Sequence, residues 1–491
     1  MSRYEKAFWA LAGGLFAFQL IYLAVTPYEL APDEAYYWTW SKRLAWGYFS
    51  KPPLVAAVMW LTTSLGGDTP FFVRLGAPIF AFLSYVALFY LAKGLFDERV
   101  AFWSFLLAAT TAASPVGGLV MTIDPPLLAF WGLTLLFLWR GLGGKAIYWY
   151  LAGLTLGLGL LSKYTMGALV PSVFAYLLFT PRARKWLRRG EPYLWVLIGG
   201  AIFLPHLLWE WRHGMVAIEH TASLVEGEGL RPYYFLEFLA TQFGLLTPVT
   251  FCLVVYGLWK GGKEALKGVD PWAFPFWAAA PLLGICVAVS LSGPCYANWG
   301  APAYIGAFVL AASSVIEAPW PPERKGRLLK GAVALGAAVC LLIYGMDLLR
   351  FLPIPQGDLP TSRLMGWRTL GQEVAAVRAS HGGQPFVITK DRRFVAELAF
   401  YTPGAFPRVY QYNPTGRPRS QFDLWGGIED EVGSDAVFVT KKGRGVPEGL
   451  REAFDRCERL KDVDITWRGR FVKGFTLYLC RDFKGFKRRE R

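Results

Sequence analysis

Long apolar stretches recur through the first 349 residues of this chain. A helix needs about 20 apolar residues to cross roughly 30 Å of hydrocarbon, because it rises about 1.5 Å per residue. About eleven stretches approach that length, which predicts a polytopic α-helical membrane protein with about 11 to 13 transmembrane helices. The stretches are residues 7–26, 70–92, 100–122, 125–139, 147–162, 165–180, 193–210, 234–258, 271–291, 298–315 and 331–349.

One further apolar segment, residues 53–66, is too short to cross a bilayer. We interpret it as an interfacial or re-entrant helix on the outer side, because a crossing at this point would move every later basic loop to that side. Residues 7–26 follow a basic start and lack a small-residue cleavage site, so we interpret them as a retained anchor and not as a signal peptide.

The pattern changes near Arg350, where short runs rich in β-branched and aromatic residues replace the long apolar stretches. These runs predict strands, and helical spacing between them predicts two helices. The sequence therefore predicts a small C-terminal α/β domain. Its expected strands are residues 386–389, 408–412, 436–440 and 475–480, and its expected helices are 391–401 and 447–456.

The charged residues divide the chain at the same place. They make up about 13% of residues 1–349 and about 30% of residues 350–491, against about 25% in soluble domains. We therefore expect a transmembrane catalytic domain over 1–349, which includes an outer loop at 27–69, and a periplasmic domain over 350–491.

Lysine and arginine gather in alternate loops, as expected if these loops are cytoplasmic. The densest groups lie in 182–189, 260–267 and 324–330. This bias predicts a multi-pass protein of the inner membrane, with a cytoplasmic N-terminus and a periplasmic C-terminal domain.

The overall composition excludes several classes of protein. With 54% hydrophobic residues and a low charged fraction, the 491-residue chain is neither disordered nor a coiled coil. The net charge of +15 does not indicate a nucleic-acid partner, because membrane topology accounts for most of the basic residues before Arg350. The basic excess of the tail suits anionic lipid headgroups or lipopolysaccharide. Six cysteines are too few for a disulfide framework; Cys457 and Cys480 can pair in the outer domain or remain thiols.

The first outer loop carries adjacent carboxylates, Asp33 and Glu34, within the motif PDEAYYW. Two adjacent carboxylates at the membrane face cost solvation free energy, and charged residues placed there are usually functional. This favours a catalytic or metal-binding role. The alternative is a pair that is simply solvated. The aromatic residues of the loop, by themselves, are typical interfacial anchors.

Further charges fall at the same outer face. Asp124 precedes two prolines, where it can act chemically or complement a helix dipole. Lys51, Arg74 and Lys163 lie beside apolar stretches, and a lysine such as Lys163 can simply snorkel to the interface. The apolar domain contains few charged residues. Those that membrane topology does not explain all fall at one membrane face.

Carboxylates and cations at an outer membrane face suit group transfer. A carboxylate can deprotonate an acceptor hydroxyl as a general base. Lysine and arginine can hold a phosphate and stabilise the charge that it gains as a leaving group. A sugar carried on a lipid phosphate fits this chemistry, although phosphate transfer or transport would use the same cations.

Six motifs resemble one family. The sequence resembles the bacterial GT-C glycosyltransferases that use polyprenyl-phosphate sugars: protein O-mannosyltransferases, aminoarabinose transferases of lipid A and galacturonosyltransferases of lipopolysaccharide. DEAYYW and SKYT resemble the last branch most. The motifs are PDEAYYW (32–38), GYFSKPPL (47–54), FFVRLGAP (71–78), TIDPPLLAFW (122–131), GLGLLSKYT (157–165) and PCYANWGAPAY (294–304).

The resemblance implies an inverting transferase whose active site opens to the periplasm. It implies that Asp33 is the principal acidic residue of catalysis, acting as a base or orienting the acceptor, with Glu34 beside it, and that Asp124 is the second acidic residue of the site. It further implies that Lys51, Lys163 and Arg74 bind the donor phosphate. Tyr36, Tyr37 and Tyr48 would either line the sugar pocket or pack.

The resemblance also raises the question of a divalent metal ion. Glu219 and His220 resemble a pair in the aminoarabinose transferases and are the candidate ligands. That group has an acidic residue before the loop lysine, whereas this chain has Ser50 in its place, so one expected ligand is absent.

We expect a polyprenyl-phosphate sugar as donor and lipid A or lipopolysaccharide core as acceptor. One alternative transfers the sugar to Ser or Thr of exported proteins. A different class, a transporter or flippase for polyprenyl-linked sugars, would usually show internal repeats and polar or broken helices at the bilayer midplane. The sequence shows neither a convincing repeat nor buried charges in the middle of a span, and its unusual residues lie at one face.

Overall fold

A computed structural model describes residues 1–225, 227 and 229–486 of the chain. The chain divides into two compact units. The helical unit comprises Met1–Val25, Ala45–Gly47 and Lys51–Tyr344. The sheet unit comprises Thr26–Leu44, Tyr48–Ser50 and the chain from Gly345 onwards. The whole motif PDEAYYW thus folds together with the C-terminal part of the chain.

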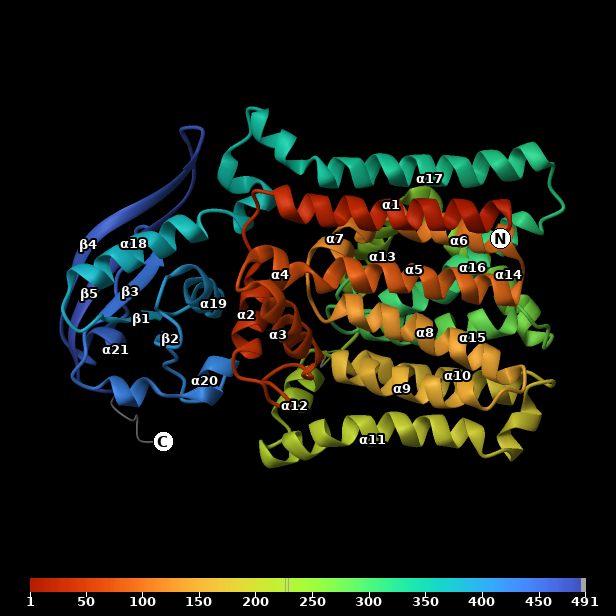
Figure 1. The fold of residues 1–491 in the computed structure, drawn as a ribbon, viewed down its shortest axis with the longest axis horizontal. Helices are drawn as coiled ribbons and strands as arrows, with labels where there is room; N and C mark the ends of the chain where they lie inside the picture. Colours follow the sequence, from red (N-terminus) through yellow and green to blue (C-terminus); the bar gives the residue numbers. More distant parts are fainter. Residues whose placement is uncertain (226, 228, 487–491) are drawn as a thin grey trace. The chain divides into compact units, whose positions relative to one another are not determined.

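The helical unit is built almost entirely of helices (Figure 1). Its first half contains α1 (Arg3–Val25), α3 (Leu54–Gly66), α4 (Pro70–Arg74), α5 (Gly76–Leu95), α6 (Glu98–Ala109), α7 (Ala113–Leu119), α8 (Asp124–Leu142), α9 (Ile147–Ser162), η1 (Tyr164–Ala168) and α10 (Leu169–Phe179). Its second half contains η2 (Arg184–Arg188), α11 (Glu191–Arg212), α12 (Val216–Ser223), α13 (Pro232–Leu246), α14 (Pro248–Leu266), α15 (Ala273–Ser290), η3 (Ala301–Ala303), α16 (Tyr304–Ile316) and α17 (Pro322–Tyr344).

Within the described residues, six helices are long and apolar enough to cross a membrane, or up to eight if each of two bent pairs forms one span. Shorter apolar helices include α3, which confirms a short helix in residues 53–66. The predicted single span at 234–258 is instead two helices, α13 and α14, bent by 110°. Thr247 has a positive φ of 67° and precedes Pro248, which lacks an N–H, so the helix cannot continue. The total number of spans stays a prediction.

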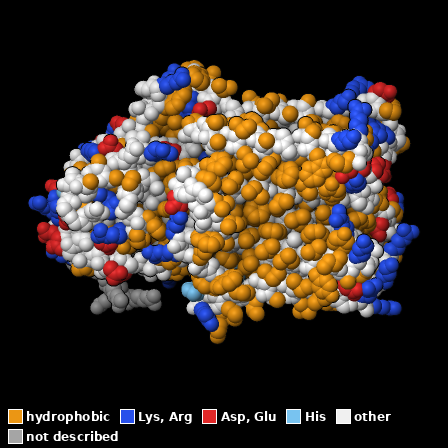
Figure 2. Space-filling view, viewed as in Figure 1, with side chains coloured by type: hydrophobic (Ala, Val, Ile, Leu, Met, Phe, Trp, Pro, Cys, Tyr) orange, Lys and Arg blue, Asp and Glu red, His pale blue; other side chains and the backbone are white. Residues whose placement is uncertain are grey.

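Figure 2 shows a broad hydrophobic face over α5, α8 and α9, as expected for helices that meet lipid. Lysine and arginine side chains gather at the end of the helical unit where α1 begins. This is the end that the sequence assigns to the cytoplasm, although the orientation itself stays a prediction.

Close packing explains the glycine-rich stretch at 152–159. A β-carbon at Gly153 would lie 2.7 Å from Cβ of Ile198, and one at Gly157 would lie 2.6 Å from Cβ of Ile202. Both isoleucines belong to α11, so the glycines allow α9 and α11 to approach closely, as small residues do between membrane helices. This stretch is therefore a helix contact and not a phosphate loop.

The sheet unit contains one five-stranded sheet in the order β2-β1-β3-β5-β4. β1 is parallel to β2 and β3, while β5 is antiparallel to β3 and β4. The strands are β1 (Phe386–Thr389), β2 (Val409–Gln411), β3 (Ala436–Lys441), β4 (Phe454–Trp467) and β5 (Arg470–Phe483). The helices are α2 (Pro32–Ser41), η4 (Met346–Phe351), η5 (Gln356–Asp358), η6 (Pro360–Leu364), α18 (Trp367–Ser380), α19 (Arg392–Tyr401), α20 (Gln421–Trp425), η7 (Ile428–Glu431) and α21 (Glu448–Arg451).

The four predicted strands are confirmed, and the last extends to fourteen residues. The helix predicted at 447–456 is wrong beyond Arg451, because Phe454 begins β4. Among the described strands, β4 pairs only with β5. β4 is rich in charged residues, which protect a sheet edge from further pairing but obscure the strand pattern in the sequence.

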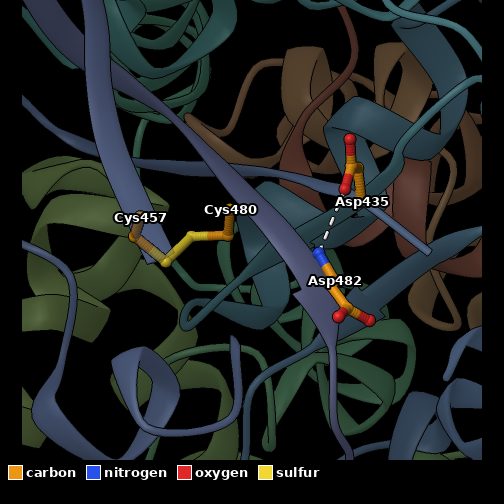
Figure 3. The surroundings of a disulfide bond; sticks show 4 residues. All are labelled: Asp435, Cys457, Cys480 and Asp482. Carbon is orange, nitrogen blue, oxygen red and sulfur yellow. Dashed lines mark hydrogen bonds between the residues drawn. A yellow bond between two sulfur atoms is a disulfide. The ribbon is translucent and has the colours of Figure 1, made fainter. Parts of the chain in front are cut away.

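Cys457 and Cys480 form a disulfide between β4 and β5 (Figure 3). The two residues are direct partners in the antiparallel ladder. Nearby, the backbone N–H of Asp482 donates to the carboxylate of Asp435 across 3.0 Å. Of the two alternatives that the sequence left open for these cysteines, the structure contains the paired one.

Candidate active site

Asp124 begins α8 in the helical unit and is held by two side chains. The Lys163 ammonium donates to its Oδ1 across 2.7 Å, and the Asn298 amide donates to its Oδ2, also across 2.7 Å. Lys163 directly follows the last residue of α9 and is 8% exposed. Three segments that are distant in sequence therefore converge on one carboxylate.

Asn298 is a residue of this candidate site that sequence reasoning did not single out. It lies in PCYANWGAPAY, one of the motifs that carry the family resemblance. An uncharged amide gave no signal in a search for unexplained charges. Its position within a matching motif was the only clue.

Lys51 and Arg74 also belong to the helical unit. Arg74 ends the short helix α4 and is buried. A β-carbon at Gly76 would lie 3.0 Å from the Met121 sulfur, so the start of α5 adjoins the turn before Asp124. Arg74 and Asp124 thus lie at the same end of the unit, while Lys51 lies three residues before α3.

A buried histidine fixes the segment before Lys51. His206 is fully buried in α11, and its Nδ1 lies 2.7 Å from the Trp46 carbonyl oxygen. A carbonyl only accepts, so Nδ1 carries the proton, and in the neutral ring Nε2 then accepts from the Tyr164 hydroxyl 2.8 Å away. Because Tyr164 follows Lys163, His206 connects the segment before Lys51 with the one that carries Lys163.

In the sheet unit, Asp33 lies in the first turn of α2. Its side chain is 57% exposed, and its Oδ1 accepts a hydrogen bond from Nη2 of Arg392 across 3.1 Å. Arg392 begins α19, and its guanidinium also lies 4.3 Å from the centre of the Tyr36 ring. The acid that the resemblance made most important is therefore accessible and oriented by an arginine of the C-terminal part.

Glu34 is placed differently from its neighbour. It is fully buried, and its Oε2 accepts from the backbone N–H of Ala31 across 2.8 Å. This interaction closes the start of α2, as the acid of a capping box does. The geometry gives Glu34 a structural role beside the predicted catalytic one.

The three tyrosines named from the sequence are buried in the sheet unit. The Tyr36 hydroxyl accepts from the backbone N–H of Gln421 across 2.6 Å, and burial raises the pKa of this hydroxyl. Tyr48 stacks on Trp40, with ring centres 4.4 Å apart, and Tyr37 packs against the same indole. Of the two roles left open for these tyrosines, the contacts favour packing.

Buried charges mark another part of the sheet unit. Burial raises the pKa of the Glu29 carboxyl, although the backbone N–H groups of Trp367 and Arg368 donate to it. Burial lowers the pKa of Lys473 to about 8, and the nearby carboxylates of Glu397 and Glu29 limit this fall.

Glu219 and His220, the candidate metal ligands, are neighbours in α12. Consecutive residues of a helix point about 100° apart, so these two side chains do not face each other. A metal ion held here would need further ligands from other segments. Among the described residues there is no group of three or more His, Cys, Asp or Glu side chains arranged to hold a metal ion.

Comparisons with known proteins show what the chain is similar to. A model of the dolichyl-phosphate-mannose-protein mannosyltransferases matches residues 50–209, which include Lys51, Arg74, Asp124 and Lys163. The lipid A galacturonosyltransferase RgtD of Rhizobium johnstonii is 26% identical over 412 residues, which cover 83% of this chain and 85% of that protein. The chain has the fold of ArnT from Cupriavidus metallidurans: TM-scores are 0.67, and 96% of this chain is covered.

The chain is similar to GT-C glycosyltransferases in sequence and in fold.

ArnT has been solved in an apo state and bound to undecaprenyl phosphate, with 16% and 17% identity to this chain and 98% and 97% of the ArnT chain covered. An undecaprenyl phosphate-α-4-amino-4-deoxy-L-arabinose arabinosyl transferase of Pseudomonas fluorescens is 29% identical over 222 residues, 41% of this chain and 40% of that protein. The likeness and the apolar helices make this transferase a multi-pass protein of the inner membrane. A transporter, the competing class considered from the sequence, is not supported.

Proposed function

We propose that this transferase moves a sugar from a polyprenyl-phosphate donor to lipid A or lipopolysaccharide core at the outer face of the inner membrane. The observation that carries the proposal is the Asp124 carboxylate, which Lys163 and Asn298 hold at one end of an apolar helical unit. The lipid A galacturonosyltransferase similar to this chain and the ArnT structure with undecaprenyl phosphate support it.

Lys163 suits the donor phosphate because its ammonium has three protons and Asp124 accepts only one of them. Asp124 orients Lys163, and Asn298 fixes Asp124 in turn. When the bond between sugar and phosphate breaks, negative charge grows on the phosphate, and a partly buried ammonium stabilises that charge more than water would. Lys51 and Arg74 supply further positive charge in the same unit.

The helical unit also contains a cavity that suits the hydrocarbon tail of such a donor. An apolar cavity of about 110 Å³ lies between helices of the helical unit. Its lining includes Pro125 and Leu128 of α8, Leu88 of α5 and Tyr304 of α16. Pro125 directly follows Asp124, so a short stretch of a lipid chain in this cavity would end beside the carboxylate.

Asp33 serves as the general base in this proposal. It accepts the proton of the acceptor hydroxyl while the hydroxyl oxygen bonds to the anomeric carbon of the sugar. The bond from that carbon to the phosphate oxygen breaks in the same step, and polyprenyl phosphate leaves with the electron pair. Attack opposite the leaving phosphate inverts the anomeric configuration.

Lipid analysis of a strain that lacks this protein tests the proposal. We expect its lipid A or lipopolysaccharide core to lose the mass of one sugar, and wild-type protein but not Asp33→Asn to restore it. The control variant Asp68→Asn changes another acid of the outer loop and should restore the sugar. Unchanged lipid A and core would contradict the proposal.

A protein acceptor is the second candidate. It is favoured by the match of residues 50–209 to the dolichyl-phosphate-mannose-protein mannosyltransferases. It predicts loss of sugar from Ser or Thr of exported proteins in the same strain, with lipid A unchanged. Mass spectrometry of both fractions separates the two functions.

The metal question has its own experiment. If Glu219 and His220 hold a divalent ion that the reaction needs, chelation and Glu219→Ala should both lower turnover, and added metal should restore it only in the wild type. Turnover that withstands chelation would remove the metal from the proposal.

A further inference from the structure

The β4–β5 hairpin projects beyond the rest of its sheet (Figure 1). β3 pairs with β5 only from Phe475 to Cys480. β4 and β5 continue to pair up to Trp467 and Arg470, so the end of the hairpin is a ribbon of two strands. A ribbon of this kind gains little stability in water by itself and needs a surface to pack against.

The segment after α17 provides part of that surface. Arg470 Nη1 donates to the Leu352 carbonyl across 3.0 Å. The rings of Phe351 and Trp467 lie 5.6 Å apart, and the Arg468 guanidinium lies 4.6 Å from the Phe351 ring. These contacts, all within the sheet unit, fix the tip of the hairpin on residues 351–352.

Apolar side chains remain exposed where the two segments meet. Phe471 is 54% exposed, Phe351 55% and Leu348 68%. Arg468 and Arg470 are exposed beside them. We call this surface the hairpin-tip patch; it consists of Leu348, Phe351, Leu352, Ile354, Trp467, Arg468, Arg470 and Phe471.

Chain connectivity limits where the patch can lie. Tyr344 ends α17, an apolar helix long enough to cross the membrane, and Leu348 follows only four residues later. Four residues span at most about 14 Å. The chain after α1 leads to the same place: Tyr28 lies three residues after Val25, and its hydroxyl donates to Asp347 across 3.1 Å. Both constraints hold the patch within reach of a membrane surface.

The composition of the patch matches that surface. Tryptophan and other amphipathic aromatic side chains favour the headgroup region, where one end of the ring is apolar and the other is wet. Arginine binds phosphate through several parallel hydrogen bonds. Phe471 and Phe351 would lose their contact with water in the interface, while Arg468 and Arg470 would meet anionic headgroups.

We propose that the hairpin-tip patch docks on the bilayer surface at which α17 ends and binds anionic phospholipid headgroups there. The hairpin tip lies more than 120 residues after α17. The sheet unit would thus contact the membrane through this hairpin as well as through its covalent links to the helical unit. Because Asp33 belongs to the same unit, docking sets the height of this acid above the bilayer.

Depth measurements on the full chain in nanodiscs test the proposal. Cys252, Cys286, Cys295 and Cys340, the free cysteines of the described chain, are first replaced. Phe471→Cys and, separately, Val432→Cys then receive the same fluorophore. Val432 is 59% exposed, and the backbone N–H of the next residue, Gly433, donates to the carbonyl of Phe483. Phe483 ends β5, about 40 Å along the strand from Phe471, so Val432 is a control site far from the tip.

Phospholipids with quenchers near the headgroup should quench the Phe471 label severalfold more than the Val432 label, and anionic lipid should increase the difference. Arg468→Glu together with Arg470→Glu should reduce it. Arg468→Cys repeats the measurement if Phe471→Cys does not fold. Equal quenching at the tip and at Val432 would overturn the proposal, as would protection of the tip label by a second copy of the chain.

Discussion

Arg392 donates a hydrogen bond to Asp33 across 3.1 Å, although 359 residues separate them. The same guanidinium lies on the ring of Tyr36, one helical turn after Asp33, so its position is fixed from two sides. The C-terminal part of the chain therefore orients the acid that we propose as the general base. In this proposal the sheet unit therefore takes part in the reaction.

The first prediction concerns this pair. Arg392→Ala should lower kcat by about tenfold or more, because a base that is no longer oriented spends less time in a productive geometry. Arg392→Lys should recover part of the loss, since a lysine keeps the charge but not the fork of donors. Arg393→Lys is the matched control, because Arg393 pairs with Asp391 instead. Additive losses in Asp33→Asn combined with Arg392→Ala would show that the two residues act separately.

A second prediction concerns the carboxylate of the helical unit. Lys163→Met should reduce kcat/KM about a hundredfold, because it removes the proposed phosphate contact and leaves the Asp124 charge without its cation. Asn298→Asp should also impair turnover, since it sets a second acid 2.7 Å from Asp124. Lys145→Met, in an exposed loop, is the control. Kinetics with varied donor measure all three, and an unchanged Lys163→Met would remove this lysine from the site.

A third prediction tests His206 as a positioning residue. His206→Phe should lower turnover, because the Trp46 carbonyl and the Tyr164 hydroxyl both lose a buried partner. Losing such partners costs about 1–3 kcal/mol per buried group. Tyr164→Phe removes one interaction only and should have the smaller effect. Donor KM should rise in His206→Phe, since His206 connects the segments of Lys51 and Lys163; a fall in thermal stability without any change in KM would contradict that role.

The fourth prediction follows from Lys473, whose pKa falls from 10.5 to about 8 on folding. Between these values the unfolded chain holds a proton that the folded chain has released, so the free energy of unfolding should rise with pH in this window. Thermal unfolding of the full chain at pH 8 to 10 measures the slope. Lys473→Met should reduce it, whereas Lys461→Met, at a half-exposed ion pair, should not. An equal slope in wild type and Lys473→Met would show that this lysine keeps its ordinary pKa.

Most helices and strands could be predicted from the sequence because their patterns are local. The apolar stretch 7–26 became α1, and FVIT became β1 with the predicted bounds. The break between α13 and α14 was missed, although Pro248 signals it, because the hydrophobic stretch continues across the break. β4 was missed because its charges obscure the alternation of an edge strand.

The candidate site was predictable only in part. Asp124 and Lys163 were found because charges are rare in an apolar domain, and they proved to be direct partners. Arg392 could not be found in this way, because the C-terminal part contains many arginines and only the fold selects the one that meets Asp33. The roles of all six charged residues in the reaction stay predictions: Asp33, Glu34, Asp124, Lys51, Lys163 and Arg74.

One measurement tests the central claim most directly. The purified chain in nanodiscs is given a polyprenyl-phosphate sugar and lipid A, and mass spectrometry follows sugar on lipid A together with the polyprenyl phosphate released. We predict that the two products form in equal amounts with inverted anomeric configuration, and that Asp33→Asn and Lys163→Met lose most of both. No transfer by the wild type to lipid A or lipopolysaccharide core, or equal transfer by wild type and both variants, would contradict the account.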